Sequence, residues 1–187
     1  MELFFSFDQQ IFFFINHLPH VWWSDFFAQA LSGAGSGGAV FLLLGLFLII
    51  REEKKDHWFL VPMLCVSGLS WFLSEIVLKM GFGRMRPSLL SETFIVGTSP
   101  VSYSFPSTHA MLAFAFAVLL SGKEPKWRWW LILLATLIGL SRIYLGYHYP
   151  MDVVVGGLLG LGIGFSIVRI YNRITFKRYK RKHNFSY

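Results

Sequence analysis

Five long apolar segments, separated by short polar ones, constrain the fold of this chain more than any other feature of its sequence. They run over residues 26–50, 58–78, 106–122, 127–147 and 150–170. A helix of about 20 apolar residues spans the hydrocarbon core of a bilayer and satisfies its own backbone hydrogen bonds there. The chain is 55% hydrophobic, and it lacks the alternating pattern of a membrane β-barrel. The sequence therefore predicts an all-α integral membrane protein with about five transmembrane helices, forming one domain over residues 1–187.

The first twenty residues predict a different kind of helix. Apolar side chains recur at helical spacing on one side, at Phe4, Phe7, Ile11, Phe14, Ile15 and Leu18. Polar side chains gather roughly opposite, at Ser6, Gln9, Gln10, Asn16 and His17. This amphipathic pattern is too polar to span a bilayer comfortably, so residues 1–20 are predicted to form a helix that lies in the membrane interface. Trp22 and Trp23 then mark a membrane boundary.

Basic residues divide the loops between the two sides of the membrane. Of the 17 Lys and Arg residues, thirteen fall within 51–56, 123–128 and 169–182. Because cytoplasmic loops carry an excess of Lys and Arg, these segments and the basic tail 171–187 are predicted to be cytoplasmic. The tail is expected to lie against anionic lipid headgroups, and nucleic acid is not an expected partner. The compact size and the basic clusters fit a bacterial inner (cytoplasmic) membrane, with the oligomeric state left open.

The four remaining cations lie in or beside the loops 79–105 and 141–149, which this topology places on the external side: Lys79, Arg84, Arg86 and Arg142. The positive-inside tendency disfavours them there, so an anion is expected on that face. The same region contains the segments KMGFGRMRP (79–87), FPSTH (105–109) and SRIYLGYHYPMD (141–152). Lys and Arg together suit a phosphoryl group, because Arg can bind two of its oxygens at once. The sequence therefore predicts an external phosphate site.

Two prolines indicate where helices begin beside these cations. Pro106 can open the third apolar segment, so that the free N–H groups near Ser107 and Thr108 would face a bound oxyanion. Pro150 can open the fifth segment, which leaves Asp152 in the first helical turn and within reach of His148. A carboxylate in that place would fix the tautomer of the imidazole and stabilise the cation formed in the reaction.

Two histidines in these segments, His109 and His148, can divide the chemistry of phosphoryl transfer. One would attack phosphorus as a neutral imidazole, and the other would protonate the leaving oxygen. Asp152 is the only acid inside the three segments, so no metal site and no cofactor are expected. The cations would then stabilise the charge of the transition state, as metal ions do in many phosphoryl-transfer sites.

The three segments resemble the type 2 phosphatidic acid phosphatase (PAP2) family, the lipid phosphate phosphatases, whose pattern is KX6RP, PSXH and SRX5HX3D. The first motif is matched by Lys79 and Arg86-Pro87, and the second by residues 106–109, with Thr108 where glycine is commonest. The third is matched by Ser141-Arg142, His148 and Asp152. The motifs cover residues 79–152, and the five apolar segments extend the likeness over most of the chain.

The resemblance implies a PAP2-like helical bundle and a role for each motif residue. Three residues would be catalytic: His148 as the nucleophile that forms a phosphohistidine, His109 as the general acid, and Asp152 as the group that orients His148. The resemblance also implies that the phosphate is bound by Lys79, Arg86, Ser107, Thr108 and Arg142. Thr108 restricts the backbone more than glycine does, but it still offers an N–H group and a hydroxyl.

The predicted function is metal-independent hydrolysis of a terminal phosphate from a membrane lipid phosphate or diphosphate on the external leaflet. Undecaprenyl diphosphate, phosphatidylglycerol phosphate, phosphatidic acid and lipid A 1-phosphate all remain open as substrates. The loop 88–104 is expected to be a lid or a contact for the lipid tail. The alternatives are a phosphotransferase with an alcohol acceptor, a vanadium-dependent haloperoxidase, and a lipid-phosphate carrier or scaffold that is not an enzyme.

Several residues outside the motifs receive other interpretations. Glu75 lies four positions before Lys79 and is expected to form a structural ion pair with it. Arg84 is expected to contact a lipid headgroup or the substrate tail, and Asp8 shows no constellation of partners. Close helix packing is predicted for the segment SGAGSGG (32–38) and for the stripe formed by Gly156, Gly160 and Gly164.

Overall fold

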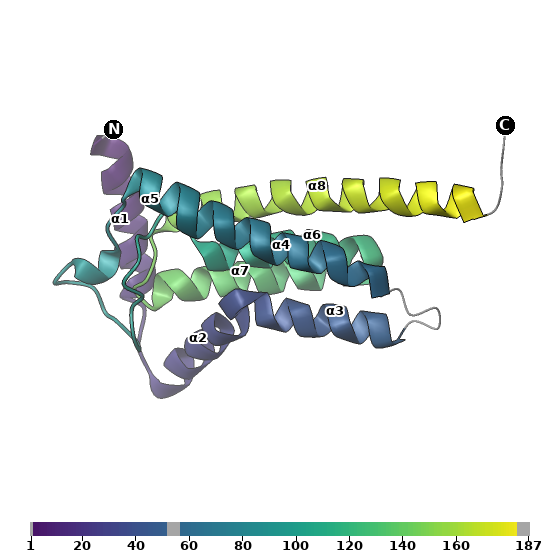
Figure 1. Ribbon diagram of the computed structural model, residues 1–187. Helices are drawn as coiled ribbons and strands as arrows, with labels where there is room; N and C mark the ends of the chain where they lie inside the picture. The colour runs from purple at the N-terminus through teal and green to yellow at the C-terminus, as the bar shows by residue number, and fades with distance from the viewer. Residues whose placement is uncertain (1, 52–56, 183–187) are drawn as a thin grey trace.

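A computed structural model describes residues 2–51 and 57–182, and this part of the chain contains helices and loops but no strand. The α-helices are α1 (Glu2–Asn16), α2 (Trp22–Gly35), α3 (Ala39–Arg51), α4 (Leu60–Trp71), α5 (Lys79–Phe82), α6 (Thr108–Lys123), α7 (Arg128–Tyr144) and α8 (Pro150–Lys182). Four short 3₁₀ turns, η1 (Ser36–Gly38), η2 (His57–Phe59), η4 (Pro87–Leu89) and η5 (Pro125–Trp127), and one π-helix, η3 (Phe72–Leu78), complete the helical structure. Helices α3, α4, α6, α7 and α8 run along one common axis, and α1 crosses one end of the bundle (Figure 1).

Each of the five predicted apolar segments coincides with helical structure. The stretches Trp22–Arg51, His57–Phe82 and Pro150–Lys177 are long and apolar enough to cross a membrane. Helix α6 is apolar but shorter, and α7 has 17 residues. The loop between α5 and α6 and the turn between α7 and α8 lie at the end of the bundle that α1 crosses, and the C-terminal end of α8 lies at the other (Figure 1). The prediction of an all-α membrane protein is confirmed, and the two loops predicted to share one side lie at the same end.

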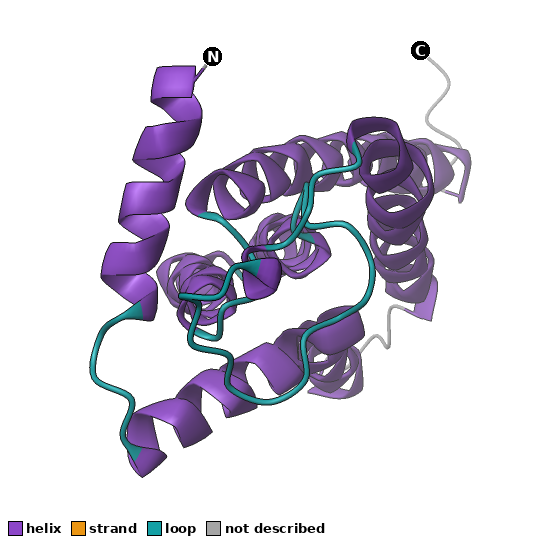
Figure 2. Ribbon diagram, turned by 90° about the vertical axis from the view of Figure 1, so that its left-hand side faces the viewer, coloured by secondary structure: helices purple, strands orange, loops and turns teal. Residues whose placement is uncertain are grey.

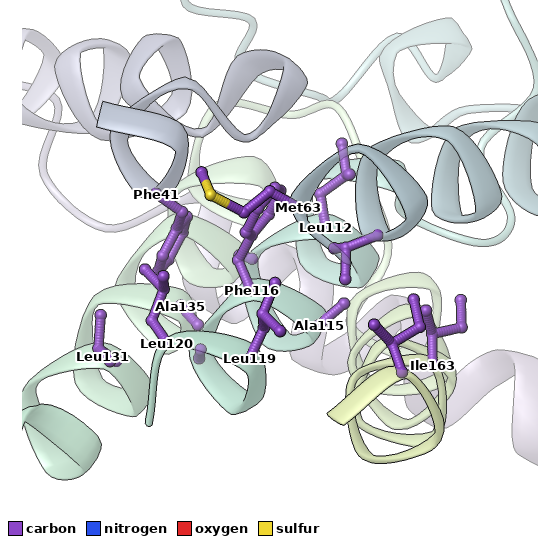
Figure 3. Close-up of a cluster of buried hydrophobic side chains, with 14 of the residues drawn as sticks. Phe41, Met63, Leu112, Ala115, Phe116, Leu119, Leu120, Leu131, Ala135 and Ile163 are labelled. Atoms are coloured by element: carbon purple, nitrogen blue, oxygen red, sulfur yellow. The ribbon is translucent and has the colours of Figure 1, made fainter. Parts of the chain in front are cut away.

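Helix α6 forms the centre of the bundle, where it packs against α2, α3, α4, α7 and α8. Phe116 of α6 stacks on Phe41 of α3, with ring centroids 6.1 Å apart. Met63 of α4 and Leu120 of α6 lie in the same buried cluster (Figure 3). Because lipid tails are as apolar as these side chains, close packing between helices, rather than removal from water, stabilises such a bundle in the membrane.

The seam between α6 and α8 depends on glycine. A Cβ atom on Gly156 would lie 2.6 Å from the carbonyl oxygen of Ser107, one on Gly160 2.2 Å from that of Met111, and one on Gly164 2.7 Å from that of Ala115. The three glycines thus meet three carbonyls at the same spacing of four residues along α6. The predicted packing stripe is confirmed, and it joins the first turns of α6 and α8 at the end where the motifs lie.

Helix α1 packs against α7 and α8, and seen end-on it lies along one side of the bundle while the loops cross over the helix ends (Figure 2). The side of α1 that faces the bundle includes polar residues. Asp8, Phe12 and Asn16 are buried, whereas Phe7 and Phe14 are exposed. Asn16 donates from Nδ2 to the carbonyl oxygens of Phe94 and Tyr144 at 2.8 and 2.9 Å. The other residues of the predicted polar side are exposed, but the amide of Asn16 is used inside the protein, where buried polar groups need partners.

Candidate functional site

The three motif segments meet at the end of the bundle that α1 crosses. The first lies at the end of α5 and in the loop that follows, the second opens α6, and the third joins α7 to α8. Five of the motif residues with ionisable side chains are buried, namely Lys79, Arg86, Arg142, His148 and Asp152, and the sixth, His109, is half-buried. The structure therefore brings together residues that lie up to 73 positions apart in the chain, as the sequence predicts.

Arg86 connects the first motif to the third. Its Nη1 donates to the carbonyl oxygen of Tyr147 at 2.8 Å and lies 3.2 Å from Nε2 of His148. Its Nε and Nη2 donate to the carbonyl oxygens of Ser102 and Tyr103, at 2.5 and 3.1 Å. The guanidinium group thereby fixes the loop between α5 and α6 against the turn that carries His148.

Lys79 connects the first motif to the second through Glu75. Its Nζ donates to Oε1 of Glu75 at 2.5 Å, which confirms the predicted ion pair. The hydroxyl of Thr108 also donates to Oε1 of Glu75, at 2.6 Å, and lies 2.7 Å from Oγ of Ser74. Ser74 and Glu75 belong to the π-helix η3, a rare geometry that is frequent at functional sites. The Thr108 hydroxyl is thus bound to Glu75, which leaves the backbone of Thr108 as its means of binding a phosphate.

The start of α6 differs from the prediction in one respect. Ser107 is the N-cap of α6, and its Oγ accepts a hydrogen bond from the N–H group of Ala110 at 3.5 Å. Its own N–H group donates to the carbonyl oxygen of Asp152 at 2.9 Å. The expectation that this N–H group is free to face an oxyanion is therefore wrong, because it joins α6 to the first turn of α8. The N–H groups of the next two residues have no acceptor within the helix.

Pro150 begins α8, as predicted, and places Asp152 in the first turn. Oδ2 of Asp152 accepts a hydrogen bond from the N–H group of Tyr149 at 2.9 Å and lies 3.5 Å from Nδ1 of His148. The carboxylate is therefore within reach of His148, as the spacing predicts. With Nδ1 turned toward Asp152, Nε2 of His148 is the nitrogen that lies on the side of Arg86.

The segment 32–38 contributes more than packing. Oγ of Ser32 accepts a hydrogen bond from Nη1 of Arg142, and Oγ of Ser36 lies 3.3 Å from Nε2 of His109. The ring of His109 is also within electrostatic range of Arg142 and His148. The prediction of close packing is confirmed at Gly38, where a Cβ atom would lie 2.7 Å from the ring of Phe116. The hydroxyls of Ser32 and Ser36 were not among the predicted site residues, although their spacing of four residues puts them on one face of a helix.

Arg84 was assigned to a lipid headgroup or substrate tail, and this assignment is wrong. Its guanidinium group donates to Asp152 and to Asp8, at 2.6 Å in each case. Asp8, which showed no constellation in the sequence, is therefore an ion-pair partner of Arg84. One of the two carboxylates, Asp152, is the group that lies 3.5 Å from Nδ1 of His148.

The electrostatics of the site favour an anion. Within the described part of the chain, neither Arg86 nor Arg142 lies within salt-bridge distance of a carboxylate. Nε of Arg142 and Nδ1 of His148 are buried without a hydrogen-bond partner. A buried charge is costly unless a counter-charge compensates it. Two guanidinium groups and a histidine thus lie together in an arrangement that a bound anion would complete.

Comparison with known proteins agrees with this geometry. A family model described as the PAP2 superfamily matches residues 57–176. An undecaprenyl-diphosphatase of Sulfolobus acidocaldarius is 34% identical over 135 residues, which are 71% of this chain and 64% of that protein. Phosphatidylglycerophosphatase B of Bacillus subtilis is 30% identical over 168 residues, which are 82% of this chain and 79% of that protein. The chain thus spans a little under two thirds of the first relative.

A solved structure gives the same result for the fold. The crystal structure of Aquifex aeolicus LpxE has a TM-score of 0.69 and 34% sequence identity, and the match covers 86% of this chain and 94% of that one. The family model covers more than half of the chain, and it includes all three motifs. This protein therefore belongs to the PAP2 superfamily.

Proposed function

We propose that this protein is a membrane lipid phosphatase that removes the terminal phosphate of a lipid phosphate or diphosphate through a phosphohistidine on His148. The observation that carries the proposal is the pair of buried guanidinium groups, Arg86 and Arg142, which lie by His148 without a carboxylate partner in the described ranges. Two relatives are named undecaprenyl-diphosphatase and phosphatidylglycerophosphatase B. Both names denote removal of phosphate from a lipid, which supports a phosphorylated lipid as the anion.

In the first step, Nε2 of His148 attacks phosphorus, and the bond between phosphorus and the lipid oxygen breaks. The leaving oxygen keeps the electron pair and takes a proton from His109. Asp152 stabilises the phosphorylated imidazole through Nδ1, which lies 3.5 Å from Oδ2; such contacts are often long before substrate binds. Arg86 and Arg142 offset the charge on the oxygens of the transferred group.

In the second step, a water molecule attacks phosphorus and gives a proton to His109. The bond between phosphorus and Nε2 of His148 breaks, and its electron pair returns to the imidazole. The products are inorganic phosphate and the dephosphorylated lipid, or a lipid monophosphate if the substrate is a diphosphate. Two carboxylates beside the site are bound to cationic side chains, Glu75 to Lys79 and Asp152 to Arg84. Arg86 and Arg142 are therefore placed to stabilise the charge on the transferred phosphoryl group without a metal.

The site is proposed to face the external side of a bacterial inner membrane. The basic clusters support this orientation, because the turn that follows α6 and the basic C-terminal part of α8 lie at the end opposite the site (Figure 1). Lys and Arg accumulate on the cytoplasmic side of membrane proteins. A substrate in the external leaflet would then have its phosphate on the same side as His148.

Phosphate release in the presence of a chelator tests the reaction as a whole. Purified protein in detergent, treated with excess EDTA, is expected to release inorganic phosphate from at least one of the four candidate lipids at an undiminished rate, because side chains supply the positive charge. In water enriched in ¹⁸O, one labelled oxygen per phosphate is expected, since water attacks phosphorus. Reversible loss of activity on chelation would contradict the metal-free mechanism. Transfer of phosphate to an added alcohol in place of water would identify a phosphotransferase.

The pH dependence of turnover follows from the surroundings of His148. Burial, followed by the charges of Arg86, Arg142 and Lys79, lowers the pKa of this histidine well below the ordinary value of 6.5. A lowered pKa means that the neutral, nucleophilic imidazole already predominates at pH 6.5 and is lost only in more acidic solution. The acidic limb of kcat/KM, which reports groups of the free enzyme, is therefore expected below pH 6.5.

The ionisation of the lipid phosphate is first measured by ³¹P NMR in the same micelles. The pH profile of kcat/KM can then be corrected for the titration of the substrate. If the corrected kcat/KM still falls at or above pH 6.5, the ordinary pKa of histidine, then His148 is not the group that must be neutral for the reaction.

A further inference from the structure

Arg84 lies between two buried carboxylates from opposite ends of the chain. It follows Gly83, whose left-handed backbone (φ 57°) ends α5 and turns the chain toward α8. Its Nη1 donates to Oδ1 of Asp152 and its Nη2 to Oδ2 of Asp8, both at 2.6 Å. Its guanidinium carbon also lies 4.1 Å from the ring centroid of Tyr149. Both terminal nitrogens of the guanidinium group are therefore engaged by carboxylates.

Asp8 binds the same region a second time. Its Oδ1 accepts a hydrogen bond from the N–H group of Met151 at 2.9 Å, one residue before Asp152. Its side chain is 3% exposed and that of Asp152 is fully buried, whereas Arg84 is 17% exposed. A single side chain of α1 thus bonds both to Arg84 and to the backbone at the start of α8. The N-terminal helix is thereby joined to the group that faces His148.

Asp152 has defined partners other than His148. Oδ1 is paired with Arg84, Oδ2 accepts the N–H group of Tyr149, and the side chain of Ser104 is a further hydrogen-bond partner. Without Arg84, the fully buried carboxylate would lose its ion pair with an arginine, and a buried charge without compensation is strongly disfavoured. The carboxylate would then reorient or take up a proton, and in either case it would no longer face Nδ1 of His148 as an anion.

We propose that Arg84 is a positioning residue that fixes Asp152 against His148, and that Asp8 of α1 in turn fixes Arg84. This inference rests on the proposed roles of Asp152 and His148. The N-terminal helix α1 then contributes to the rate of phosphoryl transfer, in addition to the membrane contact that the sequence predicts for it. An Arg is suited to the task because its planar fork binds two carboxylates at fixed angles, which a Lys cannot do.

Kinetics separate positioning from phosphate binding. Arg84→Gln is expected to lower kcat by about 10- to 100-fold, the range found when a group that orients a catalytic ligand is removed. KM and the inhibition constant of vanadate, a phosphate analogue, are expected to stay unchanged, because both Nη atoms of Arg84 bond to carboxylates. Arg84→Lys is expected to restore part of kcat, since an ammonium group can pair with one carboxylate. Asp8→Asn is expected to lower kcat less, and the double variant no further than Arg84→Gln alone.

Asp25→Asn provides the matched control. Asp25 is also an acid near the N-terminus, but its Oδ1 is bonded to His20 and to Tyr144, at 2.8 Å each, rather than to Arg84. This variant is expected to retain the kcat of wild type. A loss of kcat in Asp25→Asn equal to that in Asp8→Asn would overturn the proposal, because the effect would then be a general loosening of this end. A fall in vanadate affinity that matches the fall in kcat would overturn it too, by making Arg84 a phosphate ligand.

A readout without turnover keeps this inference separate from the proposed reaction. The chain has six histidines, and ¹⁵N-histidine NMR with His148→Ala for assignment reports which nitrogen of His148 carries the proton. Wild type is expected to show the Nδ1–H tautomer, and Arg84→Gln a mixture, whether or not phosphate is released. If wild type releases no phosphate, the proposed function is contradicted but the role of Arg84 is not. If Arg84→Gln leaves the tautomer of His148 unchanged, the role of Arg84 is contradicted but the proposed function is not.

Discussion

Replacement of His148 by alanine is expected to lower phosphate release by about 10⁴- to 10⁶-fold, the loss seen when a catalytic nucleophile is removed. The methyl group cannot form a bond to phosphorus, so no phosphoenzyme can accumulate. Labelled lipid, a rapid alkaline quench and denaturing gel analysis measure that intermediate, because phosphohistidine survives base. Arg86 and Arg142 are unchanged in this variant, so binding of the lipid phosphate is expected to persist.

His57→Ala is the matched control for this experiment. His57 is exposed at the start of η2, 22 positions before the first motif. Its removal is expected to leave both the rate of phosphate release and the amount of phosphoenzyme unaltered. Full activity of His148→Ala would contradict the proposed chemistry. Normal lipid binding by the variant, together with no release by wild type, would instead indicate a lipid-phosphate carrier.

Gly160→Ala is expected to produce the largest loss of stability among single methyl additions to α8. The new Cβ atom would lie 2.2 Å from the carbonyl oxygen of Met111, and this neighbour is backbone that cannot rotate away. Helices α6 and α8 must then separate, at a cost of about 3 kcal/mol, the upper part of the range for overpacking. Thermal unfolding in detergent, followed by tryptophan fluorescence from the seven tryptophans, measures the change.

Gly162 on the same helix is the control, because a Cβ atom there would meet nothing within 4 Å. Gly162→Ala is expected to be neutral or to stabilise the protein by up to about 1 kcal/mol, since alanine favours a helix over glycine. Equal unfolding midpoints for the two variants would show that the seam between α6 and α8 does not depend on its glycines.

Sequence predicted those parts of the site whose geometry is local. The spacing of His148, Pro150 and Asp152 fixes a turn followed by a helix start, so their proximity could be inferred without a fold. The ion pair between Glu75 and Lys79 follows in the same way from one turn of helix. The three motifs could be placed in one site because the apolar segments between them return the chain to the same end of the bundle.

The remaining contacts depend on how distant helices pack, and no periodicity signals them. Ser32 and Arg142 are 110 positions apart, and Arg84 and Asp8 are 76. On α1, the amphipathic pattern holds for Ser6, Gln9, Gln10 and His17, which are exposed. It does not show that Asp8 and Asn16 find their partners inside the protein while Phe7 and Phe14 face outward. Arg84 was likewise assigned to a lipid headgroup or the substrate tail, although it compensates two buried acids.

The length of α8 determines how deep the site lies in the membrane. Arg169 follows Asp152 by seventeen positions on this single helix, a distance of about 25 Å at 1.5 Å per residue. The hydrocarbon core of a bilayer is about 30 Å thick. A straight helix that places Arg169 at one surface of the bilayer therefore places Asp152 close to the other. His148 would then lie near that surface, and the lipid phosphate proposed as the substrate would reach it by diffusing sideways within its leaflet.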